Sequence, residues 1–437
     1  MIRASQLIGI LQEYSIPLIV GVVAGLAMAN IDFHSYEELV DFHVFGEDFE
    51  IFGREVTAHF LINEIFMVFF FGIAAKEITE SVLPGGALNP VTRAINPLMG
   101  TLGGALGPVG LFFILTLLFY GGTDDFSAVA NGWGIPTATD IALAWLVARM
   151  IFGAGHPAVN FLLLLAVADD AIGLGIIAVF YPDPEHPVEP IWVLLIVGGM
   201  ATAYLMRRVG VRQWPVYVLI AGGMSWVGLV KSGVEPALAL VVIVPFLPAL
   251  KPQVGRVQEQ TQLIESARSS GGAASGNPGQ AGMETLDHPG TGGVHAHGGG
   301  TLDQFEHHLK LPVDFGLFFF AFANAGVAFA SINQVTFIVL LSLIAGKMLG
   351  ISVFSLAGTK LGFPLPSGMR VRHLVVTSII AGLGLTVALF VANKAYEGPP
   401  FQDPAKMGAV LSAGAAVLAF AAARLFRIKR SDAVDSS

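Results

Sequence analysis

Cysteine is absent from the 437 residues of this chain, and charged residues are scarce. Without cysteine the chain can form no disulfide, thiolate nucleophile or cysteine-ligated zinc site. Charged residues make up 13% of the sequence and hydrophobic residues 54%, with a mean hydropathy of +0.70. A soluble domain has about 25% charged residues. The composition therefore excludes an ordinary soluble protein and predicts an all-α polytopic membrane protein with a single membrane domain.

Twelve apolar stretches are long enough to cross a bilayer as helices, at about 1.5 Å per residue. They cover residues 10–30, 59–76, 95–119, 134–152, 157–181, 190–206, 214–230, 234–250, 312–331, 335–357, 373–395 and 406–425. The first lacks a small-residue cleavage site after a compact apolar core, so we interpret it as a retained helix and not a signal peptide. About twelve transmembrane helices are predicted.

Lysine and arginine residues are distributed unevenly between the loops that join these stretches. Most of the 23 fall on the side that carries both chain ends, whereas Arg54, Lys231, Lys394 and Lys406 fall on the other side. Because loops rich in Lys and Arg remain in the cytoplasm, both termini are predicted to be cytoplasmic. The first external loop contains EDFEIFGREVTAHF, a candidate for a short β-hairpin.

Residues 254–304 differ from the sequence around them. They are rich in Gly, Ser and Pro and poor in large apolar residues, which predicts a disordered cytoplasmic loop. This loop would divide the chain into 1–253, with the first eight helices, and 305–430, with the last four. Residues 431–437 would form a cytoplasmic tail.

Two of the predicted helices carry residues that weaken a helix. The stretch 134–152 begins GIPTATDIA, and 373–395 contains SIIAGLGLTVAL, with Gly382, Gly384 and Thr386. Pro and paired Gly interrupt helical hydrogen bonding. These are the middle helices of two triplets, helices 3–5 and 10–12, that start from opposite sides of the membrane. Ordinary helix packing explains each Gly or Pro alone, but the paired positions favour an inverted repeat whose broken helices 4 and 11 cross at mid-membrane.

Asp140, Asp169, Asp170 and Lys347 are ionisable residues that lie within the apolar stretches. A charge at bilayer depth costs a few kcal/mol or more, so each is a candidate functional residue. Lys347 requires an anionic partner, and the three acids are the candidates. Asp140 has two interpretations, neutralising the positive N-terminal ends of broken helices or ligating an ion directly.

Asp169 and Asp170 lie about 100° apart around a helix, so they cannot have the same role. One would pair with Lys347 while the other faces a cavity. Adjacent carboxylates in a low dielectric disfavour simultaneous ionisation, so the pair can exchange a proton. Carboxylate oxygens also bind small hard cations, and Thr139 adds a hydroxyl. The alternative is a buried salt-bridge network without a role in transport.

Several motifs, in their order along the chain, resemble the NhaA family of sodium/proton antiporters. They are INEIFMVFFFGIAAKEI, GIPTATDIALA, LLLLAVADDAIGLGIIAVFY, KSGV, FFFAFANAGV, GKMLGISVF and AGLGLTVALFVA. The resemblance covers nearly all of the membrane portion. Transporters of this family are a standard example of inverted repeats, so the predicted repeat is not independent of the resemblance.

The resemblance implies electrogenic exchange of one intracellular Na⁺ or Li⁺ for two external H⁺, for sodium and pH homeostasis in a bacterial inner membrane. It implies that Asp170 is the principal carboxylate that binds Na⁺, and that its neighbour Asp169 pairs with Lys347. Asp140 and Thr139 match residues at the unwound part of helix four. We expect neither enzymatic activity nor a cofactor or nucleic-acid partner, and we keep a homodimer as an option.

The chain departs from the family pattern at positions linked to pH response. Ala74 replaces a funnel glutamate, Glu77 stands where arginine is usual, and Glu235 stands where a histidine follows KSGV. Glu306, in FEHHLKLP, does match a pH-response glutamate of the family. These departures argue against strong alkaline regulation by a separate sensor.

Two other classes of protein fit parts of the pattern. A sodium-coupled organic-anion symporter would share the architecture, and sodium-driven uptake of an organic solute would identify it. An intramembrane aspartyl protease also places two acids on neighbouring helices. Here, however, Asp169 and Asp170 are adjacent in sequence and accompanied by Lys347, which favours the antiporter.

Overall fold

The computed structural model describes residues 11–12, 15–46, 48–89, 91–182, 189–249 and 300–428, which are mostly helical. The predicted loop 254–304 lies outside these residues except at its end, where residues 301–304 are helical and not disordered. The predicted tail 431–437 also lies outside them. The described chain is consistent with the predicted helical membrane protein.

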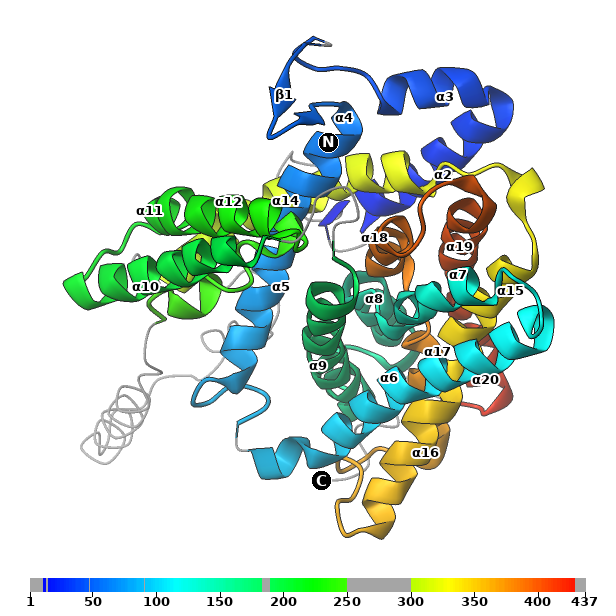
Figure 1. The fold of residues 1–437 in the computed structure, drawn as a ribbon. Helices are drawn as coiled ribbons and strands as arrows, with labels where there is room; N and C mark the ends of the chain where they lie inside the picture. The colour runs from blue at the N-terminus through cyan, green and yellow to red at the C-terminus, as the bar shows by residue number, and fades with distance from the viewer. Residues whose placement is uncertain are drawn as a thin grey trace, which may run out of the picture.

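The N-terminal part contains helices, short 3₁₀ or π segments (η) and one hairpin (Figure 1). They are α2 (Ile16–Ile31), α3 (Phe33–Val40), β1 (Glu50–Ile51), β2 (Arg54–Glu55), α4 (Ala58–Phe60), η1 (Leu61–Phe66), α5 (Met67–Val82), α6 (Val91–Tyr120), α7 (Phe126–Ala130), η2 (Asn131–Thr137), α8 (Ile141–Phe152), α9 (Pro157–Phe180), η3 (Pro190–Trp192), α10 (Val193–Val209), α11 (Trp214–Val216), η4 (Tyr217–Gly222), α12 (Gly223–Ser232), η5 (Pro236–Leu238) and η6 (Val244–Phe246).

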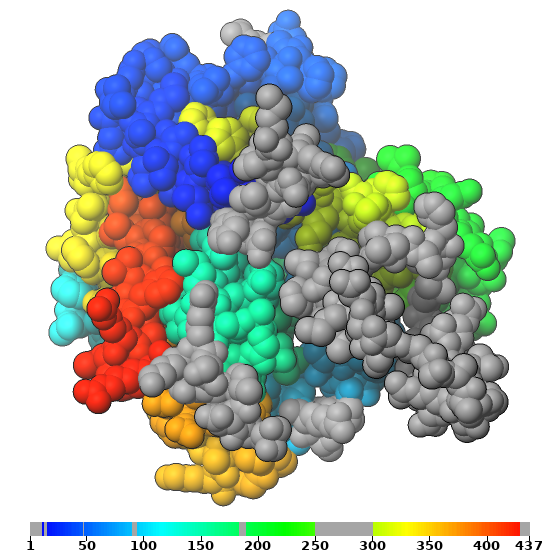
Figure 2. Space-filling model, turned by 180° about the vertical axis from the view of Figure 1, so that it is seen from behind, coloured from blue at the N-terminus to red at the C-terminus, as the bar shows by residue number. Residues whose placement is uncertain are grey.

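The described residues of the C-terminal part contain helices and short η segments but no strand. They are α14 (Thr301–Ala325), η7 (Phe329–Ser331), α15 (Gln334–Leu341), η8 (Ser342–Gly346), α16 (Lys347–Lys360), α17 (Val371–Ile380), α18 (Leu385–Ala395), α19 (Pro399–Leu411) and α20 (Gly414–Leu425). In both overall views α10–α12 (green) form one edge of the molecule, and the C-terminal helices (red) lie towards the opposite edge (Figures 1 and 2).

Seven helices among the described residues are long and apolar enough to cross a membrane, or up to nine if each of two bent pairs forms one span. One shorter apolar helix, α2, has 16 residues. These numbers agree with a multi-pass helical protein. The count of twelve spans stays a prediction.

The helix predicted over 234–250 is not a continuous helix. Residues 236–246 form η5 and η6, two short 3₁₀ segments separated by turns. Pro236, Pro245 and Pro248 explain the difference, because proline lacks the backbone N–H that a helix interior requires. The helix predicted over 312–331 instead begins at Thr301 and ends at Ala325.

The predicted hairpin is confirmed. Strands β1 and β2 pair antiparallel, with Glu50 opposite Glu55 and Ile51 opposite Arg54. The two residues between them, Phe52 and Gly53, have φ of 54° and 82°. Two positive φ values characterise the tight turn whose twist matches that of a hairpin.

Two helix pairs are broken near their middles. The pair Phe126–Thr137 and Ile141–Phe152 bends by 51°, and the pair Val371–Ile380 and Leu385–Ala395 bends by 49°. The breaks touch, because the Asp140 N–H donates to the Leu383 carbonyl over 2.6 Å. These are the helices that the sequence predicted to be weakened; the inverted repeat and the crossing at mid-membrane stay predictions.

Helix α6 packs closely against η8 and α16 through glycines. A Cβ atom added at Gly103 or Gly107 would overlap the backbone of Gly350 or Gly346. One added at Gly350 would overlap the backbone of Gly103, and one added at Gly346 would overlap that of Pro108. Small residues allow two helix backbones to approach to this degree. The approach places Lys347, at the start of α16, in the protein interior.

We predict that Gly103→Leu will lower the thermal stability of the purified protein, because its side chain would force α6 from α16. Overpacking of this kind costs about 1–3 kcal/mol. Gly110→Leu on the same helix is the matched control, since no heavy atom lies within 4 Å of a Cβ added there. Equal melting temperatures for the two variants would contradict this account.

Candidate functional site

The interior of the helical domain contains a buried ion pair. Lys347 Nζ lies 2.5 Å from Asp169 Oδ2 on α9, and both side chains are fully buried. Lys347 Nζ also donates to Thr139 Oγ1 over 2.6 Å. Because a buried charge without a partner is strongly destabilising, these contacts are what permit Lys347 and Asp169 to remain inside.

The Thr139 hydroxyl links this pair to both helix breaks. Thr139 lies between η2 and α8, and its oxygen is 2.8 Å from Asp169 Oδ2 and 3.0 Å from the Ala381 carbonyl. A hydroxyl has one proton, so it donates to one of these acceptors at a time while it accepts from Lys347. Ala381 ends the first half of the second broken helix.

Asp140 caps two half-helices at once. Its Oδ1 accepts from the Leu143 N–H at the start of α8 over 3.0 Å. Its Oδ2 accepts from the Thr386 hydroxyl over 2.9 Å and faces the Thr386 N–H at 3.4 Å, at the start of α18. A carboxylate is stabilised at a helix N-terminus by the free N–H groups and by the helix dipole. This geometry corresponds to the electrostatic interpretation of Asp140.

Gly382 and Gly384 form the second break with Leu383. A Cβ atom added at Gly382 would lie 3.0 Å from Ile344 Cα, and one at Gly384 would overlap the Leu343 side chain. These glycines are therefore required for the close approach of η8 to the break. Neither has a positive φ, so the requirement concerns space and not backbone conformation.

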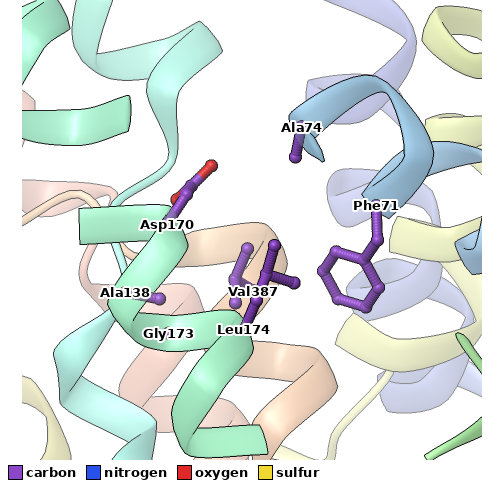
Figure 3. Close-up of a pocket in the computed structure, with 7 residues that line it drawn as sticks. All are labelled: Phe71, Ala74, Ala138, Asp170, Gly173, Leu174 and Val387. Atoms are coloured by element: carbon purple, nitrogen blue, oxygen red, sulfur yellow. The ribbon is translucent and has the colours of Figure 1, made fainter. Parts of the chain in front are cut away.

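Asp170 faces away from the ion pair, into a small cavity of about 10 Å³. The cavity is lined by Phe71, Ala74, Ala138, Asp170, Gly173, Leu174 and Val387. Figure 3 shows Asp170 on α9 across from Phe71 and Ala74 of α5, with Val387 of α18 between them. Asp170 Oδ1 is buried and accepts no hydrogen bond from the described residues. A space of roughly 10–15 Å³ holds one water molecule, so this cavity fits a single small polar species.

Glu306 lies apart from this cavity, near the start of α14. It pairs with Lys76 of α5, and its Oε1 lies 3.5 Å from Lys310 Nζ. Lys76 also lies 2.7 Å from Glu80. Glu306 thus belongs to a separate charge group that joins α14 to α5, and its proposed role in pH response stays a prediction.

A second charge group, here called the charge cluster, is largely buried and was not predicted from the sequence: Arg54, Glu64, Glu235 and Lys394. Lys394 Nζ lies 2.8 Å from Glu64 Oε1 and 2.8 Å from Glu235 Oε2. Arg54 approaches Glu64 Oε2 to 3.5 Å. A signal did exist, because Glu64 lies within an apolar stretch and Lys394 near the end of another. Their proximity could not be read from the sequence.

A family model described as "Na+/H+ antiporter 1" matches residues 7–424 of the chain. The Na⁺/H⁺ antiporter NhaA of Geobacter sulfurreducens is 48% identical, over 97% of this chain and 98% of that protein. The NhaA antiporter of Geobacter metallireducens is 49% identical over the same shares. A third relative, the NhaA antiporter of a Jannaschia species, is 40% identical over 96% of this chain and 97% of its own.

We predict that Lys347→Met and Asp169→Asn will each destabilise the protein more than the two changes together. Each single change leaves a buried charge without its partner, which costs about 3–5 kcal/mol, whereas the double change removes both charges. Thermal unfolding of the four proteins in detergent measures the coupling. Additive losses of stability would show that the two charges do not depend on each other.

Proposed function

We propose that this chain, which belongs to the Na⁺/H⁺ antiporter 1 family, exchanges intracellular Na⁺ for external H⁺ across a bacterial inner membrane. The three relatives named above are all Na⁺/H⁺ antiporters, and the described apolar helices are those of a multi-pass membrane protein. The observation that carries the proposal is the Asp170 carboxylate, which faces a cavity of single-ion size with a buried oxygen that accepts no hydrogen bond from the described residues.

Competition at Asp170 is the proposed basis of exchange. A carboxylate oxygen accepts either a proton or a small hard cation, but not both in so small a space. Sodium bound from one side would displace the proton, and a proton from the other side would displace sodium. Li⁺ has the same charge and ligand preference, so we propose it as a second substrate.

The helix breaks would supply the rest of the ion environment. The Thr139 hydroxyl and the backbone of the breaks lie beside the Asp169–Lys347 pair, and Asp140 holds the two half-helices together through Leu143 and Thr386. We propose that Gly382 and Gly384 maintain the second break. Because broken helices at corresponding positions characterise inverted-repeat transporters, the two bent pairs support the proposed repeat and crossing.

We propose that two protons enter for each sodium that leaves. Asp170 would carry one, and the Asp169–Lys347 pair, which titrates as a unit, would carry the other. The cycle then moves one net charge, worth about 2.3 kcal/mol per 100 mV. An inside-negative membrane potential would then drive sodium out of the cell even without a pH gradient. Such an export would serve sodium and pH homeostasis. We also propose that both termini are cytoplasmic and that the protein forms a homodimer.

The two alternatives are less well supported. A cavity of about 10 Å³ beside Asp170 is too small for an organic anion, which argues against the symporter. Asp169 is occupied by Lys347 and Thr139, so a pair of free catalytic carboxylates, as an aspartyl protease needs, is not available there. Peptide cleavage by the purified protein in detergent would favour the protease.

We predict that Asp170→Asn will reduce sodium/proton exchange in proteoliposomes to the background rate, because it removes the charge for which H⁺ and Na⁺ compete. Asp124→Asn, at an exposed loop position, is the control and should exchange at the native rate. Substantial exchange by purified, correctly folded Asp170→Asn would exclude Asp170 as the ion-binding carboxylate.

We also predict that an imposed potential will drive sodium flux when no pH difference is present. The measurement uses reconstituted vesicles with a potassium diffusion potential, since only an exchange with net charge movement responds to it. Flux that ignores the potential would indicate one-for-one exchange. Lys347→Ala in the same assay separates the proton carriers: retained voltage dependence points to the carboxylates, and lost dependence to the lysine.

A further inference from the structure

Helices α5 and α18 meet at successive levels that start at the Asp170 cavity. Ala74 and Val387 line the cavity itself. The buried ring of Phe71, which also lines the cavity, touches the buried ring of Phe390 edge to face, with centroids 5.1 Å apart and an interplanar angle of 82°. Residues three or four positions apart lie on one face of a helix, so Val387, Phe390 and the lysine four residues further all face α5.

That lysine, Lys394, enters the charge cluster, which forms the next level. The exposed fractions of its side chains are 16% for Lys394, 9% for Glu64, 10% for Arg54 and 0% for Glu235. Glu235 is oriented towards Lys394 because its other oxygen, Oε1, accepts from the Ala237 N–H over 3.2 Å. The cluster has two positive and two negative charges, so it is neutral as a unit.

The charge cluster joins parts of the chain that are distant in sequence. Arg54 comes from β2, Glu64 from η1, Glu235 from the residue before η5 and Lys394 from the end of α18. Side-chain amides next to two of these residues add a parallel connection. Asn393 donates to Asn324 of α14, which donates to Asn63 over 3.1 Å. The end of α18 is therefore fixed to η1 by ionic and by amide contacts.

Helix α18 links this cluster directly to the ion site. Its first turn holds Asp140 through Thr386, and its last turn carries Lys394. The two residues are eight positions apart, a distance of about 12 Å along a helix axis.

We propose that Phe71 and Phe390, together with the charge cluster, form a two-layer gate that closes the hairpin side of the Asp170 cavity. The inference rests on the proposed exchange, because an exchanger must never open its site to both sides at once. The aromatic layer excludes hydrated ions. The charge cluster holds α18 against α5, and since Lys394 is partly exposed, water can solvate the separated charges when the gate opens. Opening is thereby less costly than for a fully buried pair.

A cross-link distinguishes a gate from a static structural contact. Because the native chain has no cysteine, Glu64→Cys/Lys394→Cys contains only the two engineered thiols. The folded, reconstituted double variant is treated with a reducible bis-methanethiosulfonate reagent that bridges them. We expect sodium/proton exchange to fall by about tenfold or more and to return after reduction, because the states with an open gate are no longer populated.

Full exchange by verified cross-linked protein would overturn the gate, since a contact that never opens tolerates a permanent bridge. Each single cysteine variant treated with the same reagent is the control and should retain its own untreated rate. Absence of exchange in the native protein would instead refute the proposed function. The two failures are therefore distinguishable.

A second measurement does not depend on transport. Ala74→Cys places a thiol in the cavity, and a membrane-impermeant methanethiosulfonate is added from the hairpin side. Adding Lys394→Met/Glu235→Gln removes one charge of each sign and leaves the Arg54–Glu64 pair. The thiol should then react about tenfold faster than in Ala74→Cys alone, which corresponds to a shift of about 1.4 kcal/mol.

The matched control removes a charge pair far from the gate. His34→Gln/Glu38→Gln takes away the exposed contact between His34 Nε2 and Glu38 Oε1 on α3, which is 3.2 Å long. The Ala74→Cys thiol should react from the hairpin side at an unchanged rate in that background. Equal rates in the presence and absence of Lys394→Met/Glu235→Gln would overturn the gate even if no variant transports sodium.

Discussion

A lysine cannot remain charged inside an apolar domain without an anion beside it, and the Lys347–Asp169 pair meets that requirement. The other features of the site follow from it. With Asp169 held by the lysine and by Thr139, the adjacent Asp170 is directed to a different side of α9 and into its own cavity. One acid is thus committed to a structural contact, and the other keeps an oxygen available for a proton or an ion.

A single acid also stabilises both helix breaks. Interrupting a helix exposes N–H groups at the start of its second half, and here two such ends meet at a single carboxylate, Asp140. The N-terminal ends attract negative charge, so one acid stabilises both half-helices. Close packing of the breaks requires that Gly382 and Gly384 lack side chains. The site therefore combines the ends of half-helices with side chains of α9 and α16.

Charge also marks both ends of the continuous segment formed by η1 and α5. Lys76 pairs with Glu80 and Glu306 towards one end, and Glu64 pairs with Lys394 and Arg54 towards the other. The Asp170 cavity lies between them, lined by Phe71 and Ala74. The Asp170 carboxylate thus lies beside an apolar cavity wall that has ionic contacts on both sides.

Much about this protein followed from local sequence. Scarce charge and long apolar stretches predicted a helical membrane protein, and GIPTATDIA and AGLGLT predicted the two weakened helices. Asp169, Asp170 and Lys347 were candidate site residues, because an ionisable residue in an apolar stretch is costly wherever it lies. The prolines at 236, 245 and 248 argued against a helix over 234–250. The high hydropathy of that stretch nevertheless led to the prediction of a helix there. The residues alone left open which acid pairs with Lys347, although the family resemblance implied Asp169, and the structure shows that pair. Only the tertiary structure decided that Asp140 caps two half-helices and that Glu64 meets Lys394, 330 positions away. Such contacts depend on how helices far apart in the chain pack together, and neither hydropathy nor residue spacing encodes that arrangement.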